Sequence, residues 1–524
     1  MNLIIKVTPH IYTTEEPTYW RSKFIAQLQL QRLCIGMTLF SYGIPLIFLL
    51  AHFCQSFPLS APDVSFIAGV VEFRTNQSVE SANVEQNLHA YEMLAENASR
   101  EGVQILVFPE DMIIGYRYER RSAIYPYLEE LPPTPTAGVS IIPCNNSMYE
   151  NQYIFQRLSC IAKRHQLVLV ANMGEKAPCS ASSDPNCPSD GRYQYETNVV
   201  FEADGRFIAK YRKYNLIAVE KEILNVPPLE YVAFTTSFGA TFGLFTCSDL
   251  FFKDPALVLA ERGVENFIFT TAWGNQLPYF MSVAIQQAWS LKTRTNLLAA
   301  NHHEPTDNQL PGTGSGIYSS GTPISTFVSG EEFTPASGHL VVARIPPDSP
   351  GEQVVVKAKG VGTAKPSNLA VKVLTGDTPV YISYTLPEGK ATFTCSLNYN
   401  FKERYFDETY ALGALVHSLE GSHSAVCTLF KCTDASCKET SFQPTTKAAS
   451  TTFSGISLTG EFPEGSVVFP IVVGNNYHLF PPQHLQLVGN TLTVKDPVLS
   501  SPLLSVSMWT ILKGVPGQKP EQNP

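Results

Sequence analysis

Three side chains with catalytic potential each follow a predicted β-strand. Glu110, Lys213 and Cys247 all stand within two residues of the end of a mostly apolar run. In open α/β architectures, functional residues gather beyond the carboxyl ends of the strands. We therefore expect these three side chains to meet at one site.

A carboxylate, an ammonium group and a thiol together are suited to cutting amides. A thiol with a pKa of about 8.5 is mostly protonated at neutral pH, and a neighbouring carboxylate can accept its proton as a general base. The ammonium group can stabilise first the thiolate and then the oxyanion of a tetrahedral intermediate. Water activated by the same carboxylate can then hydrolyse the resulting thioester. This chemistry needs no histidine.

Each of these residue types has a more common role when it occurs alone. A glutamate after a strand is usually a helix cap or a surface group, and a lysine is usually a solvated charge. A cysteine at a strand end is usually buried and inert or joined in a disulfide. Only the shared context favours a catalytic role, and a catalytically inactive binding protein is the alternative of another class.

The elements that must position these side chains alternate between strand-like and helix-like segments over residues 63–345. Apolar residues at helical spacing begin at Val84 and predict a helix that ends near Gly102. Asp204-Gly205 between two strand-like runs predicts a hairpin. The alternation predicts an α/β domain with helices covering a sheet. The predicted strands lie at 66–71, 103–108, 167–171, 198–202, 206–211, 242–246, 267–271 and 297–301, and further helices lie at 153–164, 255–262 and 280–294.

Residues 346–524 have a different composition and predict a smaller β-rich domain. Gly, Pro, Ser and Thr are frequent there, and runs at 353–358, 369–374, 390–396 and 466–473 look like strands between turns. The chain ends in a polar segment, 518–524, whereas a lipid-anchor signal needs a terminal apolar tail. We expect no such anchor.

The composition limits the class of protein. The chain has 524 residues, of which 44% are hydrophobic, and a formal net charge of −9. Domains usually contain about 100–200 residues, so two or three folded units are expected. The hydrophobic content argues against wholesale disorder. The negative charge argues against nucleic-acid binding, which needs a basic face.

Residues 1–62 predict an N-terminal leader. Arg21, Lys23 and Arg32 precede an apolar run at 33–53 that contains no charged residue, and small residues follow near 58–62. This order predicts a signal peptide with cleavage close to residue 60 and a secreted protein. An apolar run of about 20 residues can also span a bilayer, so a membrane anchor is the alternative. Met37 would be an alternative start within the run.

Three glycosylation motifs and the cysteine count agree with export. The motifs begin at Asn76, Asn97 and Asn145. The nine cysteines beyond the leader are Cys144, Cys160, Cys179, Cys187, Cys247, Cys395, Cys427, Cys432 and Cys437. Nine is an odd number, so four disulfides would leave one thiol free in an oxidising compartment. The sequence leaves the pairing open, although Cys179 with Cys187 and Cys432 with Cys437 would close short loops.

No motif indicates a metal or another cofactor. His302-His303 are adjacent, and adjacent side chains rarely bind one ion. The glycines at 312, 314 and 316 lack the Lys-Ser/Thr of a phosphate-binding loop and predict a turn. We expect a small-molecule substrate and no cofactor.

Four strings in order along the chain resemble the nitrilase superfamily. They are LVFPED at 106–111, YRKYNL at 211–216, FTCSD at 245–249 and FTTAWGNQLP at 269–278. More narrowly, the chain is similar to the vanin (pantetheinase) and biotinidase branch. The resemblance is dense over residues 63–345 and weaker beyond. It implies an α-β-β-α sandwich followed by a β-rich base domain.

The resemblance also implies residue roles. It makes Glu110 the general base, Lys213 the oxyanion stabiliser and Cys247 the nucleophile, with the backbone N–H of Ser248 as the second oxyanion donor. Glu220 resembles an accessory glutamate that orients the lysine, although a surface charge would explain it equally well.

The resemblance extends to the substrate pocket. Trp273 and Asn275 match pocket-lining positions, although core packing is an alternative for Trp273. Ser248 stands where the branch commonly has an aromatic residue, so a wider pocket is expected beside the nucleophile. The resemblance favours hydrolysis of pantetheine to pantothenate and cysteamine, with biocytin or biotin amides as the alternative substrates.

Overall fold

The computed structural model describes residues 64–79, 81–136, 138–307, 311–346, 352–356, 369–376, 378–385, 392–419, 422–435, 437 and 448–512. The predicted leader at 1–62 lies outside these residues. Within them, we find no helix with the length and apolar character needed to cross a bilayer.

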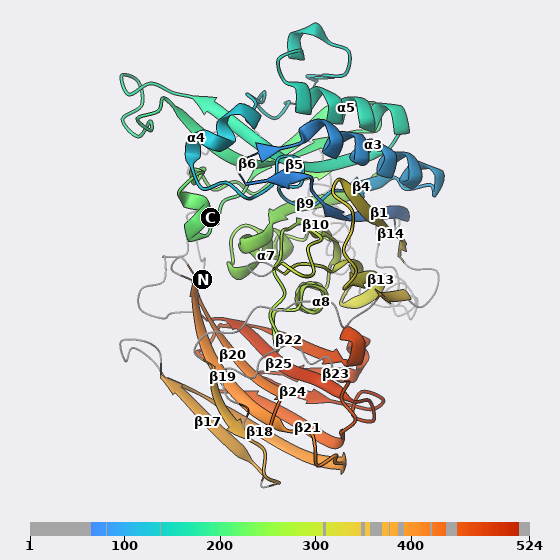
Figure 1. The fold of residues 1–524 in the computed structure, drawn as a ribbon, viewed down its shortest axis with the longest axis vertical. Helices are drawn as coiled ribbons and strands as arrows, with labels where there is room; N and C mark the ends of the chain where they lie inside the picture. The colour runs from blue at the N-terminus through green and yellow to red at the C-terminus, as the bar shows by residue number, and fades with distance from the viewer. Residues whose placement is uncertain are drawn as a thin grey trace, which may run out of the picture. The chain divides into compact units, whose positions relative to one another are not determined.

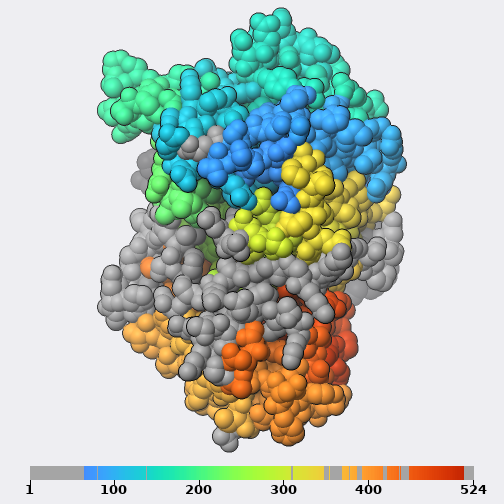
Figure 2. Space-filling view, viewed as in Figure 1, coloured from blue at the N-terminus to red at the C-terminus, as the bar shows by residue number. Residues whose placement is uncertain are grey.

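The first part of the chain contains two sheets. The six-stranded sheet has the order β14-β1-β4-β5-β6-β7, with β1 (Phe66–Arg74), β4 (Ile105–Val107) and β5 (Val168–Pro178) parallel to one another. Its remaining strands are β6 (Arg192–Phe201), β7 (Phe207–Arg212) and β14 (Ser337–Ile345). The space-filling view shows blue and yellow segments side by side (Figure 2), as the antiparallel pairing of β1 with β14 requires.

The seven-stranded sheet has the order β15-β13-β12-β11-β10-β9-β8. Its central strands β9 (Thr241–Thr246), β10 (Asn266–Thr270) and β11 (Asn296–Ala300) are parallel. The outer strands are β8 (Ala233–Thr235), β12 (Ser315–Ser319), β13 (Thr322–Ser329) and β15 (Glu352–Val356). The run predicted as a strand at 353–358 is thus β15, and it pairs with β13. The predicted domain boundary at 345 stays a prediction.

Alternate residues of the strands enter different cores because successive side chains of a strand point to opposite faces. Val70 and Ile268 belong to the core between the two sheets. Val71 packs with helices α3 (Val84–Arg100) and α5 (Tyr153–His165) in the outer core of the six-stranded sheet, and Figure 1 shows both helices along that sheet. Phe267 packs in the outer core of the other sheet with α7 (Ala256–Glu261) and α8 (Ser282–Thr293). This layering confirms the predicted α-β-β-α sandwich.

The C-terminal part consists of two antiparallel five-stranded sheets. Their orders are β16-β19-β20-β25-β22 and β17-β18-β21-β24-β23. The first contains β16 (Ala370–Val373), β19 (Tyr410–Leu419), β20 (Ser422–Lys431), β22 (Val467–Gly474) and β25 (Leu503–Ile511). The second contains β17 (Val380–Thr385), β18 (Thr392–Glu403), β21 (Thr452–Gly460), β23 (Leu485–Val488) and β24 (Thr491–Val494). The Cys395–Cys427 disulfide joins β18 to β20 across their shared core.

Candidate active site

The three predicted catalytic residues lie at a common edge of the two sheets of the sandwich. Glu110 follows β4 and Lys213 follows β7 of the six-stranded sheet, whereas Cys247 follows β9 of the seven-stranded sheet. Glu110 and Cys247 line a cavity of about 380 Å³. Lys213 is buried against Glu110 at its floor. The site is therefore formed by the strand ends of two stacked sheets rather than by one open sheet.

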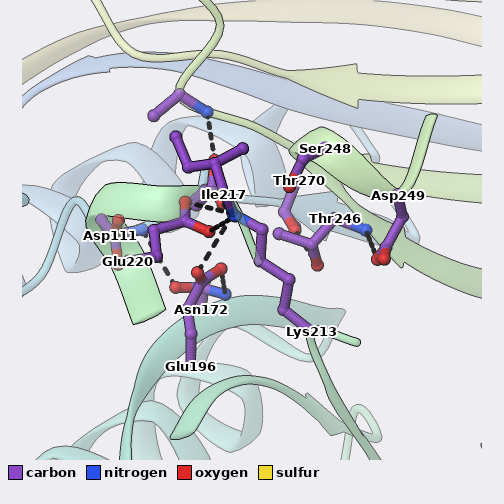
Figure 3. Close-up of polar contacts among 12 residues, drawn as sticks. Asp111, Asn172, Glu196, Lys213, Ile217, Glu220, Thr246, Ser248, Asp249 and Thr270 are labelled. Carbon is purple, nitrogen blue, oxygen red and sulfur yellow. Dashed lines mark hydrogen bonds and ion pairs between the residues drawn. The ribbon is translucent and has the colours of Figure 1, made fainter. Parts of the chain in front are cut away.

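Lys213 lies among three carboxylates. Its Nζ donates to Glu110 Oε1 at 2.6 Å and to Glu220 Oε1 at 2.6 Å, and it lies 3.4 Å from Glu196 Oε2. Figure 3 shows its side chain reaching toward Glu196 and Glu220. Burial disfavours the charged ammonium, but the three carboxylates outweigh it and raise the pKa of Lys213 well above its usual value. The lysine is therefore a permanent cation. We call Lys213, Glu110, Glu196 and Glu220 the lysine cluster.

Glu110 is held at both carboxylate oxygens. Its Oε1 accepts from Lys213, and its Oε2 accepts from the backbone N–H of Ala272 at 2.6 Å. The side chain is almost fully buried. Two donors on a buried carboxylate fix its orientation.

Cys247 occupies a sharp turn between β9 and the short 3₁₀ helix η3 (Cys247–Phe251). Its φ of +42° lies in the left-handed region, which non-glycine residues seldom adopt. Its thiol is half-buried, and it is the one free cysteine within the described part of the chain. Burial and then Glu110 raise the pKa of Cys247 well above its usual value, although Lys213 opposes the shift. The resting thiol is therefore protonated and needs a base.

Asp249 holds the turn that carries Cys247. Its Oδ2 accepts from the Thr246 N–H at 2.9 Å and the Tyr211 hydroxyl at 2.7 Å. Its Oδ1 accepts from the N–H and the side-chain amide of Asn215 at 3.0 and 2.8 Å. A single buried carboxylate thus joins the turn after β9 to the loop after β7, which positions Cys247 relative to Lys213.

A polar bridge between the sheets lies beneath the site. Asn198 on β6 donates to Thr246 Oγ1 at 3.0 Å and accepts from Thr270 Oγ1 at 3.0 Å, and both threonines belong to the seven-stranded sheet. Asn172 on β5 donates to Asn198 Oδ1 at 2.9 Å and to Glu196 Oε1 at 3.0 Å. These contacts fix the relative positions of the two sheets where the reactive residues meet.

The accessory residues predicted beside the cluster both line the cavity; Ser248 is buried and Glu220 is partly buried. Glu220, on α6 (Ala218–Lys221), also accepts from the Ile217 N–H through Oε2 at 2.9 Å, so both of its carboxylate oxygens have a donor within the site. Its role in orienting the lysine stays a prediction. Ser248 lines the cavity, and its hydroxyl donates to the Asn215 carbonyl at 2.5 Å. The small side chain thus faces the loop after β7 instead of filling the pocket.

The two predicted pocket residues differ in their placement. Trp273 lines the cavity, and its ring stacks on Phe251 at a centroid distance of 5.4 Å. Asn275 is fully buried and is absent from the cavity lining. Its amide donates to the Thr313 carbonyl at 3.0 Å and accepts from the Ser282 N–H at 2.9 Å. The expectation that Asn275 lines the pocket therefore does not hold, because its side chain anchors this loop to the start of α8.

Trp273 belongs to an aromatic wall that we define as Phe251, Trp273 and Phe280. Phe280 packs edge-on against Trp273 at 5.8 Å and against Phe251 at 5.4 Å. Trp509 of β25 packs edge-on behind both phenylalanines at 5.7 Å. The sequence motifs contained Trp273, but they gave no sign of the contact with β25.

Glu196 is a site residue that the sequence analysis did not identify. It lies inside β6, where the alternation of side chains turns it toward Lys213. The strand predicted at 198–202 begins two residues after Glu196, whereas β6 begins at Arg192. A glutamate at this point of the chain carries no signal that it faces a buried lysine 17 residues further along.

The remaining predicted polar residues have separate positions. His303 Nδ1 pairs with Glu72 at 2.6 Å, and the Gly314 N–H donates to the same carboxylate at 2.7 Å, so the glycine turn is anchored to β1. His302 is fully buried beside it, and burial lowers the pKa of His302 to about 4.

The eight disulfide-bonded cysteines and the asparagines of the glycosylation motifs do not line the cavity. The disulfides are Cys144–Cys160, Cys179–Cys187, Cys395–Cys427 and Cys432–Cys437, which include both short loops that the sequence suggested. Asn97 and Asn145 are exposed, and Asn76 is partly buried. Glycosylation at these three positions stays a prediction.

Comparisons with known proteins agree with this architecture. A family model for carbon-nitrogen hydrolases matches residues 70–304, and a model for the vanin C-terminal domain matches residues 374–511. The chain is 36% identical to the pantetheinase of Bos taurus over 445 residues, covering 82% of this chain and 84% of that protein. It is 34% identical to the biotinidase of Bos taurus over 470 residues, covering 81% of this chain and 86% of that protein. Among solved structures, an amidase from Nesterenkonia sp. is 20% identical, with coverage of 56% of this chain and 94% of that chain and a TM-score of 0.40.

Proposed function

Because the chain belongs to the carbon-nitrogen hydrolase family, in the branch with a vanin C-terminal domain, we propose that it hydrolyses the amide of pantetheine to pantothenate and cysteamine. The membership makes it a hydrolase of linear C–N amide bonds and confirms the family resemblance of the motifs. Its substrate is a small molecule.

The observation that carries the proposal is the contact between Lys213 and Glu110 at 2.6 Å beside the free thiol of Cys247. It supports Glu110 as the base, Lys213 as the electrostatic partner and Cys247 as the nucleophile. The raised pKa of Cys247 fits this assignment, since a protonated thiol needs a base at the moment of attack.

In the first half of the reaction, Glu110 accepts the proton of the Cys247 thiol while the sulfur attacks the substrate carbonyl carbon. A C–S bond forms and the carbonyl oxygen becomes an oxyanion, which Lys213 and the Ser248 backbone N–H stabilise. The C–N bond then breaks, and the amine leaves with the proton from Glu110. The enzyme is left as a thioester.

In the second half, a water molecule replaces the amine. Glu110 accepts a proton from this water, whose oxygen attacks the thioester carbonyl. The C–S bond breaks, the sulfur takes back the proton and the carboxylic acid is released. One water is consumed for each amide, and the enzyme returns to its starting protonation state.

The cavity supports a substrate with a neutral, partly apolar acyl group. Its volume of about 380 Å³ lies within the usual range for small-molecule pockets of about 300–1,000 Å³. The aromatic wall supplies one side, and Ile124, Ile223 and Leu224 add further apolar lining. Biocytin is the competing substrate because biotinidases resemble the chain to a similar extent.

A comparison of the two amides tests the proposal. We expect a higher kcat/KM for pantetheine than for biocytin, and intact-mass analysis of quenched reactions should detect a pantothenoyl adduct on Cys247. Cys247→Ser should remain folded and lose nearly all turnover, because a hydroxyl is far harder to ionise than a thiol. Faster turnover of biocytin would reverse the substrate assignment. Full activity of Cys247→Ser would refute the thioester, and binding of either amide without turnover would favour the inactive binding protein.

The proposed location is extracellular. Four disulfides within the described residues support folding in an oxidising compartment. N-terminal sequencing of protein from the culture medium tests cleavage near residue 60, and recovery of the intact chain from membranes would indicate an anchor instead.

A further inference from the structure

We propose that Glu196 is a positioning residue of this site and acts as a neutral carboxylic acid, so that Lys213 faces two ionised carboxylates rather than three. The inference rests on the proposed function for its link to turnover. Its geometric basis is independent of the substrate.

The hydrogen-bond donors around the cluster are unevenly distributed. Both oxygens of Glu110 and both oxygens of Glu220 accept a hydrogen bond, and each of these groups receives a 2.6 Å bond from Lys213. Glu196 is 4% exposed, and its Oε1 accepts from Asn172. Its Oε2 has no hydrogen-bond partner among the described residues and lies 3.4 Å from Lys213 Nζ.

A buried oxygen without a donor is unfavourable for an ionised carboxylate, whose charge needs hydrogen bonds on both oxygens. A proton on Glu196 Oε2 removes this deficit and turns the oxygen into a donor. One carboxylate oxygen from each of Glu110, Glu196 and Glu220 lies within 4.8 Å of the others, so the proton also removes a third negative charge from this small volume. The distribution of donors thus identifies Glu196 as the protonated member.

The charge balance leads to the same assignment. Three ionised carboxylates around one ammonium would leave a net charge of −2 in a water-excluded site. Burial and then Glu110 raise the pKa of Glu196 well above its usual value, with only Lys213 opposing them. Burial raises the pKa of Glu220 as well, but less strongly, because the charge of Lys213 and the hydrogen bonds from Lys213 and the Ile217 N–H oppose it. The charged or titratable groups that face Glu196 from the surrounding elements are Glu110, Asp111, Lys213, Glu220 and Tyr211.

The neutral state of Glu196 matters for the thiol. An additional negative charge in the lysine cluster would draw Lys213 away from Glu110 and would disfavour the thiolate of Cys247. Glu196 gains and loses no proton in the two half-reactions, so it acts only through the position and charge of Lys213.

Two substitutions separate a neutral acid from an ionised one. Glu196→Gln keeps the shape and the hydrogen-bonding capacity without the charge, and we expect it to retain kcat/KM at neutral pH within about three-fold. Glu196→Leu removes one of the two buried acceptors of the Asn172 side-chain amide and places an apolar group beside Lys213, and we expect a loss of about ten-fold or more. Glu220→Gln provides the matched comparison: it removes an ionised partner of Lys213 and should be more damaging than Glu196→Gln.

The pH dependence provides a readout that a purely structural role would not change. Because the protonated form is the productive one, wild-type activity should fall as Glu196 ionises at alkaline pH, and Glu196→Gln should lack this fall. The rate of Cys247 alkylation by iodoacetamide, measured without substrate, should be equal in wild type and Glu196→Gln at neutral pH. At alkaline pH it should be higher in Glu196→Gln than in wild type. This second readout remains valid if pantetheine is not the substrate.

Two outcomes would overturn the inference. One is a Glu196→Gln variant as inactive as Glu196→Leu with an unchanged melting temperature, which would mean that the charge is required. The other is a set of pH profiles, for turnover and for alkylation, that superimpose for wild type and Glu196→Gln.

Discussion

The lysine cluster, through Glu110 and Glu220, and the aromatic wall contribute to the lining of the same cavity but depend on different physical interactions. Within the cluster, Lys213 Nζ lies 2.6 to 3.4 Å from the carboxyl oxygens of its three partners, and the arrangement is maintained by electrostatic attraction around a buried lysine. Within the wall, ring centroids lie 5.4 to 5.8 Å apart, and the arrangement is maintained by packing. The reaction rate should therefore depend on the charges of the lysine cluster and on pH, whereas substrate binding against the aromatic wall should depend on shape.

The two regions also differ in how far their support extends through the chain. The lysine cluster is built from β4, β6, β7 and α6, all within the sandwich. The wall is backed by Trp509, and the Ser422 hydroxyl donates to the Phe251 carbonyl at 2.9 Å. Phe251 ends the 3₁₀ helix that begins with Cys247. The C-terminal sheets therefore support the wall of the pocket directly.

The largest effect is expected from Lys213→Ala. The change removes the oxyanion partner and leaves the ionised carboxylates of the lysine cluster without their cation, which disfavours the charged form that a general base needs. We expect kcat/KM to fall by about 100-fold to 1,000-fold, mostly in kcat, as a loss of about 3–4 kcal/mol of transition-state stabilisation implies. Steady-state kinetics measures kcat and kcat/KM, and a thermal melt checks that the variant is folded.

Lys210→Ala is the matched control for Lys213→Ala. Lys210 lies three residues earlier on β7 and pairs with Glu175 at 2.7 Å outside the cavity. Its loss should lower the melting temperature and leave turnover close to wild type. Equal losses of turnover in both variants would show that the fold, rather than the lysine cluster, limits activity.

The sequence predicted the lysine cluster better than the wall, and the reason is physical. Glu110, Lys213 and Cys247 stand at strand ends, and the apolar runs before them are visible as patterns. Glu196 and Asp249 gain their roles from neighbours that only the folded sheets bring near. The contact of Trp509 with Phe251 joins two distant parts of the chain, and no local periodicity encodes it.

A smaller effect of a different kind is expected from Trp509→Leu. The shorter side chain removes the ring that packs behind Phe251 and Phe280, so these side chains should become less well ordered around the substrate. We expect KM to rise about five-fold with a smaller change in kcat, because an aromatic pair is worth about 0.5–1.5 kcal/mol. Alkylation of Cys247 by iodoacetamide should keep its rate, since this small reagent does not need the wall.

Phe453→Leu provides the control for the loss of packing. Phe453 is fully buried between the two C-terminal sheets, in a core separate from that of Trp509. We expect it to lower the melting temperature and leave KM unchanged. A rise in KM equal to that of Trp509→Leu would mean that general loosening of the C-terminal part, not the contact with the wall, changes substrate binding.

The smallest effect concerns a buried carboxylate without the strong cation pairing of the lysine cluster. Glu129 accepts from the Ile154 and Phe155 N–H groups at 2.6 and 2.9 Å at the start of α5, and burial raises the pKa of Glu129 to about 7. Glu175 is equally enclosed, but its bonds to Arg212 and Lys210 outweigh burial and lower its pKa. The contrast separates the effect of burial on the pKa of a glutamate from the effect of neighbouring cations.

The contrast predicts opposite linkage to pH for the two glutamates. The folded state prefers protonated Glu129, so its contribution to stability is present below about pH 4.5 and is lost as pH rises through about 7. Glu129→Gln should therefore gain melting temperature relative to wild type between pH 5 and pH 8, by a few degrees at most. Glu175→Gln should show a constant difference over this range, because Glu175 is ionised in both states there and loses its stabilising contribution only at lower pH. Melting curves of the three proteins across this range measure the differences, and a flat difference for Glu129→Gln would show that its two backbone hydrogen bonds, not burial, determine its ionisation.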